Sequence, residues 1–570
     1  MNLNLRAKEQ NTYDAIVIGS GVAGGWAAKE LTEKGLKVIM LERGHALEHV
    51  SGYESAMKHP WEFKYGGRIT EEQRKTHPYL SRDYPYGEAN ASYWFDDEKA
   101  PYSEVKRFDW YRPNIVGGKS IMWGRQSYRL GDIDFEANAK EGIAIDWPIR
   151  YKDIAPWYSY VERFAGISGE KLGLEQLPDG EFLPPMEYNC AEQVVKKSIA
   201  EKFPGRVMTM GRVANLSKAA KPHTDVGRAS CQYRNLCSRG CPYGAYFSTQ
   251  SATLPAAMKT GRLTLKPDSI VNSIMYDEKT QKASGVKVID ANTSQMTEYY
   301  AKLVFVCASA MSSTWILLNS MSNRFPNGLG NDNDILGRYL MDHHFRTGAS
   351  GTLEGYDDQY YFGRRANGIY VPRYRNIGSD KRDYLRGFGY QGGGSRAGWQ
   401  RLVAEMGFGA ELKEKAVKPG PWTMGLGGFG ETLPYHENRL YLNKEKLDKW
   451  GQPTLTFDAE LKENEKKMRK DMANDAAEML TAAGLKNVNT YDGGSYLGMA
   501  IHEMGTARMG RDPKTSILNA NNQVWGAKNV FVTDGAAMTS ASCVNPSLTY
   551  MALTARAADF AVKELKKKNL

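Results

Sequence analysis

Residues 13–44 read YDAIVIGSGVAGGWAAKELTEKGLKVIMLERG, and this stretch decides the fold of the first part of the chain. A short apolar strand leads into a glycine turn, which opens a helix that is followed by a second apolar strand. Gly19 permits the tight turn, Gly21 lets backbone N–H groups approach a pyrophosphate, and Gly24 allows the helix to pack closely on the strand. The stretch therefore predicts a strand–helix–strand unit that binds an adenine dinucleotide.

An acidic residue at the end of the second strand indicates which kind of dinucleotide is bound. Glu42 lies 18 residues beyond Gly24, where a carboxylate can accept hydrogen bonds from the ribose hydroxyls. Its negative charge disfavours a 2′-phosphate at the same position. The N-terminus of the helix between them would face the phosphates with the positive end of its dipole. The alternative is a nucleotide-binding fold that has lost its ligand.

Length and composition exclude several classes of protein. At 570 residues the chain is long enough for two or more large domains. The net charge is +10, from 75 basic and 65 acidic residues, but no nucleic-acid-binding module accompanies the excess, so no nucleic-acid partner is expected. The mean hydropathy is −0.54, and no run approaches about 18 apolar residues, so no membrane-spanning helix is expected. Residues 1–12 lack the apolar region and cleavage site of an export signal.

Three of the six cysteines form the compact motif Cys231-Gln-Tyr-Arg-Asn-Leu-Cys237-Ser-Arg-Gly-Cys241-Pro. The motif has the spacing of the ferredoxin run C-x2-C-x2-C-x3-C-P, with the second cysteine replaced by Arg234. Three cysteine ligands are the requirement of a [3Fe–4S] cluster, so Cys231, Cys237 and Cys241 are the predicted ligands of one. The alternatives are a disulfide with one odd thiol, a zinc site that uses His223, and three unmodified cysteines.

The last quarter of the chain carries candidate reaction chemistry. A strand over 529–533 ends in Asp534-Gly535, and an amphipathic helix is predicted to start at Pro546. Asn545 precedes this proline, which is favoured at the first helical position, so its side chain either caps the helix or faces a ligand. Further upstream, His502 lies in a glycine-rich loop. A single histidine is more often structural than catalytic, so this pattern alone does not assign its role.

Five segments occur in the order of one known family. They are the glycine turn, 112–124, 336–344, the loop around His502 and the helix start at Asn545. Over essentially its whole length the chain resembles glucose–methanol–choline (GMC) oxidoreductases, FAD enzymes that oxidise alcohols and sugars. Within that family the three-cysteine motif is similar to that of the catalytic subunits of FAD sugar dehydrogenases. These include the glucose, gluconate and fructose dehydrogenases and the glucoside 3-dehydrogenases.

The resemblance implies a mixed α/β (α+β) fold with a Rossmann-like FAD-binding domain and a discontinuous substrate-binding domain built on an antiparallel sheet. The FAD-binding domain, which would include the cysteine loop at 228–246, is expected to comprise residues 1–48, 110–135, 190–345 and 495–570. The substrate-binding or cap domain is expected to comprise residues 49–109, 136–189 and 346–494.

The resemblance also implies roles for single residues. His502 corresponds to the base that accepts the hydroxyl proton while hydride passes to flavin N5. Asn545 corresponds to its partner, although many relatives have a second histidine there. Met122 stands where some relatives carry a histidine bonded to the flavin, so FAD is expected to be bound non-covalently. The expected FAD-binding positions are Gly19, Gly21, Gly24, Glu42, Gly117, Gly118, Met122, Val271, Asp534, Gly535 and Pro546.

Two features of the middle of the chain bear on the substrate. Glycines between residues 387 and 398 favour a mobile loop that closes over the substrate. Residues 356–441 are rich in aromatic side chains, which either form ordinary core or stack on sugar rings. These are Tyr356, Tyr360, Tyr361, Phe362, Tyr370, Tyr374, Tyr384, Phe388, Tyr390, Trp399, Trp422, Phe429, Tyr435 and Tyr441.

The expected activity is oxidation of a CH–OH group of a sugar, sugar acid or glycoside by FAD. Electrons would leave through the [3Fe–4S] cluster to a cytochrome or quinone, with a small accessory subunit. The alternatives are an oxidase that passes electrons to O2 and a non-catalytic electron-transfer subunit. Without an export signal of its own, the chain is expected either in the cytoplasm or in the periplasm, reached by co-export with a signal-bearing small subunit.

Overall fold

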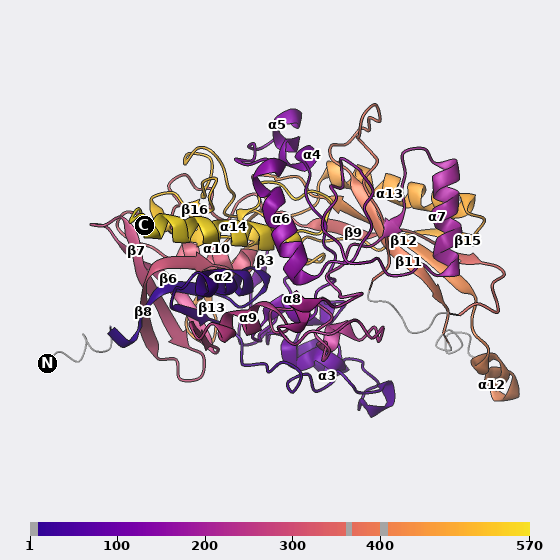
Figure 1. Ribbon diagram of the computed structural model, residues 1–570, viewed down its shortest axis with the longest axis horizontal. Helices are drawn as coiled ribbons and strands as arrows, with labels where there is room; N and C mark the ends of the chain where they lie inside the picture. The colour runs from indigo at the N-terminus through magenta and orange to yellow at the C-terminus, as the bar shows by residue number, and fades with distance from the viewer. Residues whose placement is uncertain (1–8, 361–366, 399–407) are drawn as a thin grey trace.

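The computed structural model describes residues 9–360, 367–398 and 408–570 (Figure 1). Three of the aromatic residues noted above, Tyr361, Phe362 and Trp399, lie outside the described residues. The strands of the described part form an eight-stranded, a six-stranded and a three-stranded sheet. No helix in this part of the chain is long and apolar enough to cross a membrane.

The dinucleotide-binding unit lies at the centre of the eight-stranded sheet. β1 (Thr12–Ile18) pairs in parallel with β2 (Val38–Leu41) on one side and β8 (Met296–Val306) on the other. α2 (Val22–Glu33) connects β1 to β2, as the glycine turn predicts. The other strands of this sheet are β5 (Leu263–Lys266), β6 (Ser269–Asp277), β7 (Lys282–Asp290), β16 (Gln523–Val524) and β17 (Ala527–Val532).

Both faces of the central sheet are buried. Side chains alternate along β1, so that Ala15 and Val17 face one hydrophobic core while Ile16 and Ile18 face another. α2 covers the core that contains Ala15 and Val17, and residues of α9 and α14 belong to the same core. α10 and the β6–β7 hairpin contribute to the core that contains Ile16 and Ile18. The bounds of these three helices are α9 (Thr253–Lys259), α10 (Ala310–Asn319) and α14 (Ser547–Lys566).

Parallel pairing brings distant segments to one edge of this sheet. β17 pairs in parallel with β8, which pairs in parallel with β1. The carboxyl ends of the parallel strands therefore meet, and the residues that follow them lie at a common edge: Gly19, Glu42, Ala308 and Asp534. Ligands of open α/β sheets bind at this edge.

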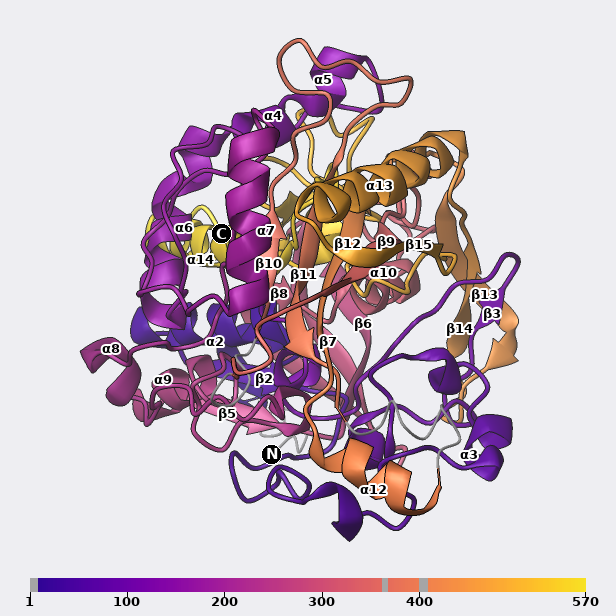
Figure 2. The ribbon, with the colours of Figure 1, turned by 90° about the vertical axis from the view of Figure 1, so that its right-hand side faces the viewer.

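The six-stranded sheet is antiparallel, and α13 (Glu463–Ala482) and α7 (Cys190–Lys202) pack against it (Figure 2). Its strand order is β15-β9-β12-β11-β10-β4. A Rossmann-like sheet beside an antiparallel one confirms the predicted fold class. The domain bounds stay a prediction. The six strands are β4 (Thr209–Met210), β9 (His343–Leu353), β10 (Ile369–Val371), β11 (Phe388–Arg396), β12 (Trp422–Glu431) and β15 (Lys486–Asp492).

The predicted mobile loop over residues 387–398 is wrong, because β11 lies inside the sheet between β10 and β12. Its glycines allow close packing. A Cβ atom at Gly392 would lie 2.0 Å from the carbonyl oxygen of Gly425, and one at Gly394 would lie 2.6 Å from Asn189 Oδ1. Glycine in a strand interior marks such a close approach as often as it marks flexibility.

Five of the eleven aromatic side chains between 356 and 441 that the structure describes are buried core, whereas Tyr356, Tyr360 and Tyr441 are exposed. Tyr384, Phe388, Tyr390 and Trp422 are buried in the core of the six-stranded sheet. Phe429 is an exception, because it lines a cavity at the edge of the central sheet. An aromatic residue at period-two spacing in a strand packs inward unless a local irregularity redirects it.

The remaining elements connect these sheets. The three-stranded sheet consists of β3 (Ser103–Glu104), β13 (Arg439–Leu447) and β14 (Pro453–Asp458). The other α-helices are α3 (Glu71–Thr76), α4 (Asp132–Phe135), α5 (Ala137–Glu141), α6 (Tyr151–Ala165), α8 (Lys221–Thr224) and α12 (Gly409–Val417). Short 3₁₀ helices are η1 (Pro60–Glu62), η2 (Leu80–Arg82), η3 (Glu88–Tyr93), η4 (Gly118–Ile121), η5 (Cys237–Arg239) and η6 (Gly535–Ala537).

Candidate active site

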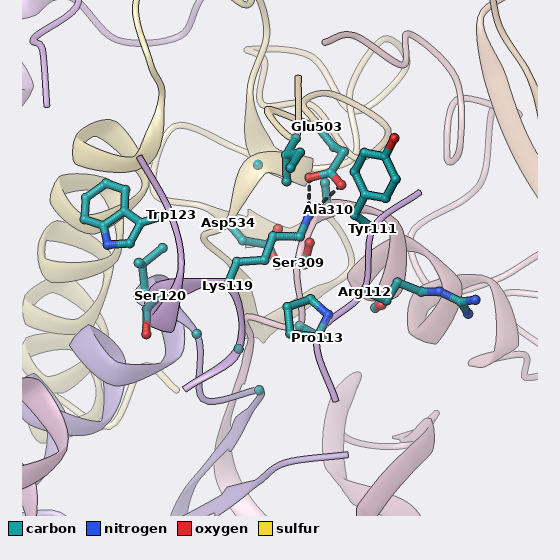
Figure 3. Close-up of a pocket in the computed structure, with 18 of the residues that line it drawn as sticks. Tyr111, Arg112, Pro113, Lys119, Ser120, Trp123, Ser309, Ala310, Glu503 and Asp534 are labelled. Carbon is teal, nitrogen blue, oxygen red and sulfur yellow. Dashed lines mark hydrogen bonds and ion pairs between the residues drawn. The ribbon is translucent and has the colours of Figure 1, made fainter. Parts of the chain in front are cut away.

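A cavity of about 570 Å³ lies at the carboxyl edge of the central sheet (Figure 3). The glycine turn and Glu42 form part of its wall, together with residues that follow β8 and β17. Residues 110–113, 118–126 and 500–503 complete much of the remainder. The cavity thus unites segments that are far apart in the sequence.

Eight of the eleven predicted FAD-binding residues line this cavity. The other three, Gly24, Gly117 and Pro546, do not line it. A Cβ atom at Gly24 would lie 1.9 Å from the carbonyl oxygen of Gly19, so this glycine serves the close helix packing that the sequence predicted. Gly117 has a φ of 95° and donates its N–H to Ser20 Oγ (2.7 Å), and Pro546 stands at the start of α14. The eight lining residues are Gly19, Gly21, Glu42, Gly118, Met122, Val271, Asp534 and Gly535.

The lining of the cavity fits a dinucleotide. A Cβ atom at Gly21 would meet nothing within 4 Å, so the turn leaves open space where a pyrophosphate can approach its N–H groups. Glu42 braces this turn, because its Oε2 accepts hydrogen bonds from Ser20 N (2.8 Å) and Ser20 Oγ (2.6 Å). Asp534 is held by Ser313 Oγ (2.5 Å) and Ala536 N (3.0 Å), and burial raises the pKa of its carboxyl to about 6.

His502 reaches the cavity on a loop that Asp342 fixes. Asp342 Oδ1 accepts hydrogen bonds from the backbone N–H groups of His502 (2.9 Å) and His343 (2.8 Å), and its Oδ2 accepts one from Ala500 N (3.1 Å). Burial, and secondly the nearby Glu503 carboxylate, raise the pKa of Asp342 to about 7. One buried carboxyl therefore ties the start of β9 to the loop that carries His502.

A directed chain of hydrogen bonds fixes the tautomer of His502. His343 Nε2 lies 2.7 Å from the carbonyl oxygen of Ser542, which can only accept, so Nε2 carries the proton. His343 Nδ1 then accepts from the Nδ1–H of His502, at 2.8 Å. His502 Nε2 is left with its lone pair, which accepts a hydrogen bond from Asn545 Nδ2 at 3.1 Å. That nitrogen is an acceptor beside the cavity, which is the state that a general base requires.

Asn545 faces His502 and does not cap a helix. Asn545 Nδ2 lies 3.1 Å from His502 Nε2, and Asn545 Oδ1 accepts a hydrogen bond from Gln391 Nε2 at 2.7 Å. α14 begins after Pro546, and no side-chain hydrogen bond caps it. The structure thus brings together the two residues that the family resemblance paired, and the second N–H of the Asn545 amide can still donate to a ligand.

Several site residues were missed by the sequence reasoning. Asp342 and His343 lie in the run 336–344 that marked the resemblance, and their adjacency in an Asp-His-His triplet was the available signal. Gln391 gave no signal, because it lies on the strand that was interpreted as a loop. Lys119 was also missed. Figure 3 shows its side chain extending to Glu503, and its Nζ lies 2.5 Å from Glu503 Oε1.

The three cysteines of the motif are free thiols, each half-buried. Within residues 9–360, 367–398 and 408–570, no group of three or more His, Cys, Asp or Glu side chains is arranged to hold a metal ion. The structure therefore does not support the predicted [3Fe–4S] cluster at Cys231, Cys237 and Cys241. Burial, and secondly the thiols of Cys237 and Cys241, raise the pKa of Cys231, and Cys237 lines the large cavity.

His223 does not support the zinc alternative. Its Nδ1 accepts a hydrogen bond from Ala220 N (3.0 Å), and its Nε2 lies 3.1 Å from the carbonyl oxygen of Arg163. Both ring nitrogens are therefore engaged by the backbone. Because a zinc-bound histidine needs one free nitrogen, His223 serves here as a structural residue.

Comparisons with known proteins agree with this geometry. The chain is 28% identical to the 2-methyl-1,2-propanediol dehydrogenase of Mycolicibacterium austroafricanum, over 96% of this chain and 94% of that protein. It is 25% identical to the fructose dehydrogenase large subunit of Gluconobacter japonicus, over 98% and 99% of the two chains. A solved structure, pyridoxine 4-oxidase from Mesorbium loti, superposes with a TM-score of 0.58 at 16% identity, covering 96% and 98% of the two chains, and shows the fold alone.

The family models decide the assignment. The N-terminal model of the GMC oxidoreductases matches residues 13–345, and the C-terminal model matches residues 434–554. The first match contains the glycine turn and the second contains His502 and Asn545. Because these matches cover most of its length, the chain belongs to the GMC oxidoreductase family.

Proposed function

We propose that this protein is an FAD-dependent dehydrogenase that oxidises a CH–OH group of a sugar, sugar acid or glycoside, with His502 as the base. The observation that carries the proposal is the directed hydrogen-bond chain that leaves His502 Nε2 as an acceptor beside the cavity. Membership of the GMC family implies FAD, and FAD when bound supplies a hydride acceptor at its N5 atom. The fructose dehydrogenase large subunit among the relatives supports a sugar as the substrate class.

The protein's own residues would divide the work of the reaction. Gly19, Gly21 and the start of α2 would hold the pyrophosphate, and Glu42 would accept from the ribose hydroxyls. His502 Nε2 would accept the proton of the substrate hydroxyl. Asn545 Nδ2 would donate a hydrogen bond to the same oxygen and so orient the carbinol carbon. Gln391 would keep the amide of Asn545 in this orientation through its hydrogen bond to Oδ1.

His343 would act as a positioning residue for the base. It accepts the Nδ1–H of His502, and this hydrogen bond holds the imidazole in the tautomer with a free Nε2. After proton transfer both nitrogens of His502 carry protons, and the bond to His343 can persist because His502 Nδ1 remains the donor. The hydrogen bond to His343 therefore needs no rearrangement when the base is protonated, whereas the Asn545 amide must turn away from Nε2, which is then itself a donor.

The electrons of the reduced flavin would leave the protein through a partner. One relative is named as a large subunit, which supports the proposal that this protein works with an accessory subunit. A cytochrome or a quinone would accept the electrons. The [3Fe–4S] cluster stays a prediction from the sequence that the described residues do not support. About three irons per chain and a 3Fe signal in electron paramagnetic resonance would restore it. Iron-free protein that turns over rapidly with a cytochrome or quinone would remove it.

The compartment is part of the same proposal. Co-export with a signal-bearing small subunit would bring the folded chain to the periplasm, and retention in the cytoplasm is the alternative. Fractionation of cells with and without the candidate small subunit separates the two. Activity confined to the cytoplasm in both strains would exclude co-export.

The pH dependence of the reaction should reflect the burial of the base. Burial lowers the pKa of His502 well below its ordinary 6.5 and lowers that of His343 to about 4. Because a base must be unprotonated, acid removes activity only below the pKa of the buried group. Anaerobic rapid mixing should give a rate of flavin reduction that is level from neutral pH through 6.5 and falls only at lower pH. A fall centred on 6.5 would show that His502 is not the desolvated base described here.

FAD is expected to leave the protein on denaturation with acid or heat. Met122, which lines the cavity at the position in question, offers no nucleophile for a bond to the flavin. Precipitated polypeptide should therefore be free of flavin fluorescence, and the supernatant should contain all of it. Fluorescence that remains with the washed polypeptide would contradict non-covalent binding.

The proposed function is tested by bleaching of the flavin absorbance under anaerobic conditions with a panel of sugars, sugar acids, glycosides and short diols. We expect bleaching by at least one carbohydrate, and analysis of the product identifies the carbon oxidised. Bleaching by diols alone would overturn the sugar assignment. Rapid re-oxidation of the bleached flavin by O2 would favour the oxidase alternative, and no bleaching with any donor would favour the non-catalytic one.

A further inference from the structure

A bulge between β9 and β12 presents aromatic side chains beside the candidate base. Where the two strands leave regular register, β9 has two residues opposite one of β12, so Phe429 opposes both Phe345 and Arg346. Such bulges redirect side chains and are frequent next to active sites. Arg346 also has a φ of 62°, a left-handed conformation that few non-glycine residues adopt. The left-handed conformation of Arg346 is thus part of the bulge itself.

The redirected rings form a ladder that leads away from His502. The ring of Phe429 lies 6.3 Å from that of His502, centroid to centroid. On its other side it stacks on Phe345 at 5.3 Å with an interplanar angle of 19°. Phe345 in turn contacts the exposed ring of Tyr84 edge-on at 5.9 Å. The aromatic surface therefore runs from the reaction centre to the outside of the molecule.

A second cavity, of about 480 Å³, lies along this ladder. Phe429 lines both this cavity and the large one, so the two adjoin. The glycines in its lining have no side chains to fill it. Its lining residues are Phe345, Arg346, Gly427, Gly428, Phe429, Tyr491, Asp492 and Gly493.

The chemistry of the second cavity matches a sugar ring. Aromatic faces such as those of Phe345 and the exposed Tyr491 can cover the C–H face of a pyranose. Among the residues that the structure describes, the guanidinium of the exposed Arg346 makes only a weak contact, to Met499 Sδ at 4.0 Å, so its N–H groups can donate to hydroxyls. Asp492 pairs with Arg469, yet its side chain is 50% exposed and can accept from a hydroxyl. A purely apolar group would leave the guanidinium of Arg346 unmatched.

We propose that this second cavity is a sugar subsite that binds the ring next to the one being oxidised. The proposal rests on the proposed function and sharpens it: the preferred substrates are disaccharides or longer glycosides, with the reacting ring against His502. The neighbouring ring stacks on Phe345 and Tyr491 and forms hydrogen bonds with Arg346 and Asp492. A free monosaccharide reaches the base but leaves this subsite empty.

The test compares pairs of sugars that share the reacting ring. The pairs are methyl β-glucoside with cellobiose, and methyl β-galactoside with lactose. For each sugar, the dissociation constant is measured with the FAD-loaded enzyme by calorimetry, and the rate of flavin reduction is measured by anaerobic rapid mixing. The variants are Tyr491→Ala, which removes the stacking ring, and Arg346→Gly, which removes the guanidinium and suits the left-handed backbone. The matched control is Tyr441→Ala, since Tyr441 is similarly exposed on β13, in a different sheet.

For at least one pair, the wild-type enzyme should bind the disaccharide more tightly than the methyl glycoside. Tyr491→Ala should weaken disaccharide binding roughly three- to tenfold, the range expected for one aromatic contact, and should leave methyl glycoside binding and the limiting reduction rate as they are. Equal affinities within both pairs, or no response to either variant, would overturn the subsite while the proposed function stands. Tyr491-dependent binding without flavin reduction would support the subsite and overturn the proposed function. Failure of all four sugars to bind would overturn the subsite.

Discussion

Replacing His502 with alanine should slow substrate-driven flavin reduction by roughly 10²–10⁴-fold, the usual effect of removing a positioned general base. The FAD content should stay near that of the wild type, because the His502 side chain contacts His343, Asn545 and Phe429, none of which belongs to the glycine turn. Anaerobic rapid mixing with the best carbohydrate of the panel measures the rate. The absorbance ratio of flavin to protein measures the cofactor content.

Two further variants separate the loss of the base from a loss of structure. His502→Gln keeps a hydrogen-bonding side chain on the loop but cannot accept a proton, so it should be nearly as slow as the alanine variant. His436→Ala is the matched control, since His436 is exposed and packs against Tyr339 away from the base. A reduction rate within a few-fold of wild type in both His502 variants would show that His502 is structural and that the proposed mechanism is wrong.

The second large effect is expected at the glycine turn. A Cβ atom at Gly24 would lie 1.9 Å from the carbonyl oxygen of Gly19, so Gly24→Ala must displace the turn that receives the pyrophosphate. Overpacking of this kind costs about 1–3 kcal/mol, and every 1.4 kcal/mol is about a factor of ten in affinity. The dissociation constant of FAD should therefore rise by roughly one to two orders of magnitude. The melting temperature of the FAD-free protein should fall as well.

Gly21→Ala provides the contrast. A Cβ atom at Gly21 would meet nothing within 4 Å, so the FAD-free protein should melt at the wild-type temperature. FAD affinity should nevertheless fall, because the methyl group would stand where the pyrophosphate approaches the backbone. Titration of the FAD-free variants with FAD, followed by flavin fluorescence, gives both constants. Wild-type affinity in the Gly24 variant would show that FAD binds elsewhere.

Local features of the fold were predictable because their signals are local. The unit over 13–44 carries its strands, turn and helix within one continuous stretch, and the structure has the helix at Val22–Glu33. The C-terminal helix was predicted from Pro546 and begins at Ser547. In both places, residue type and periodicity act over one or two turns of chain, so no knowledge of distant contacts was needed.

Non-local features could not be predicted in this way. The base is oriented by His343, at the start of β9, and its partner Asn545 is oriented by Gln391, on β11. These strands join the site only through antiparallel pairing across the six-stranded sheet. The glycines of β11 resemble those of a flexible loop when only the sequence is read. Their role is to allow close approach to β12, whose residues lie about 35 positions further along the chain. The spacing of the cysteines in the sequence likewise does not determine how their thiols are arranged in the folded protein.

The most direct test of the central claim uses a carbohydrate of the panel with deuterium on its carbons. The claim is that a carbohydrate C–H bond breaks as flavin is reduced, with His502 as the base. Anaerobic rapid mixing compares the rates of flavin reduction by the labelled and unlabelled sugar in the wild-type enzyme. The account predicts slower reduction with the labelled sugar at saturating concentration. Equal rates with the two sugars, or no reduction by any carbohydrate, would contradict it.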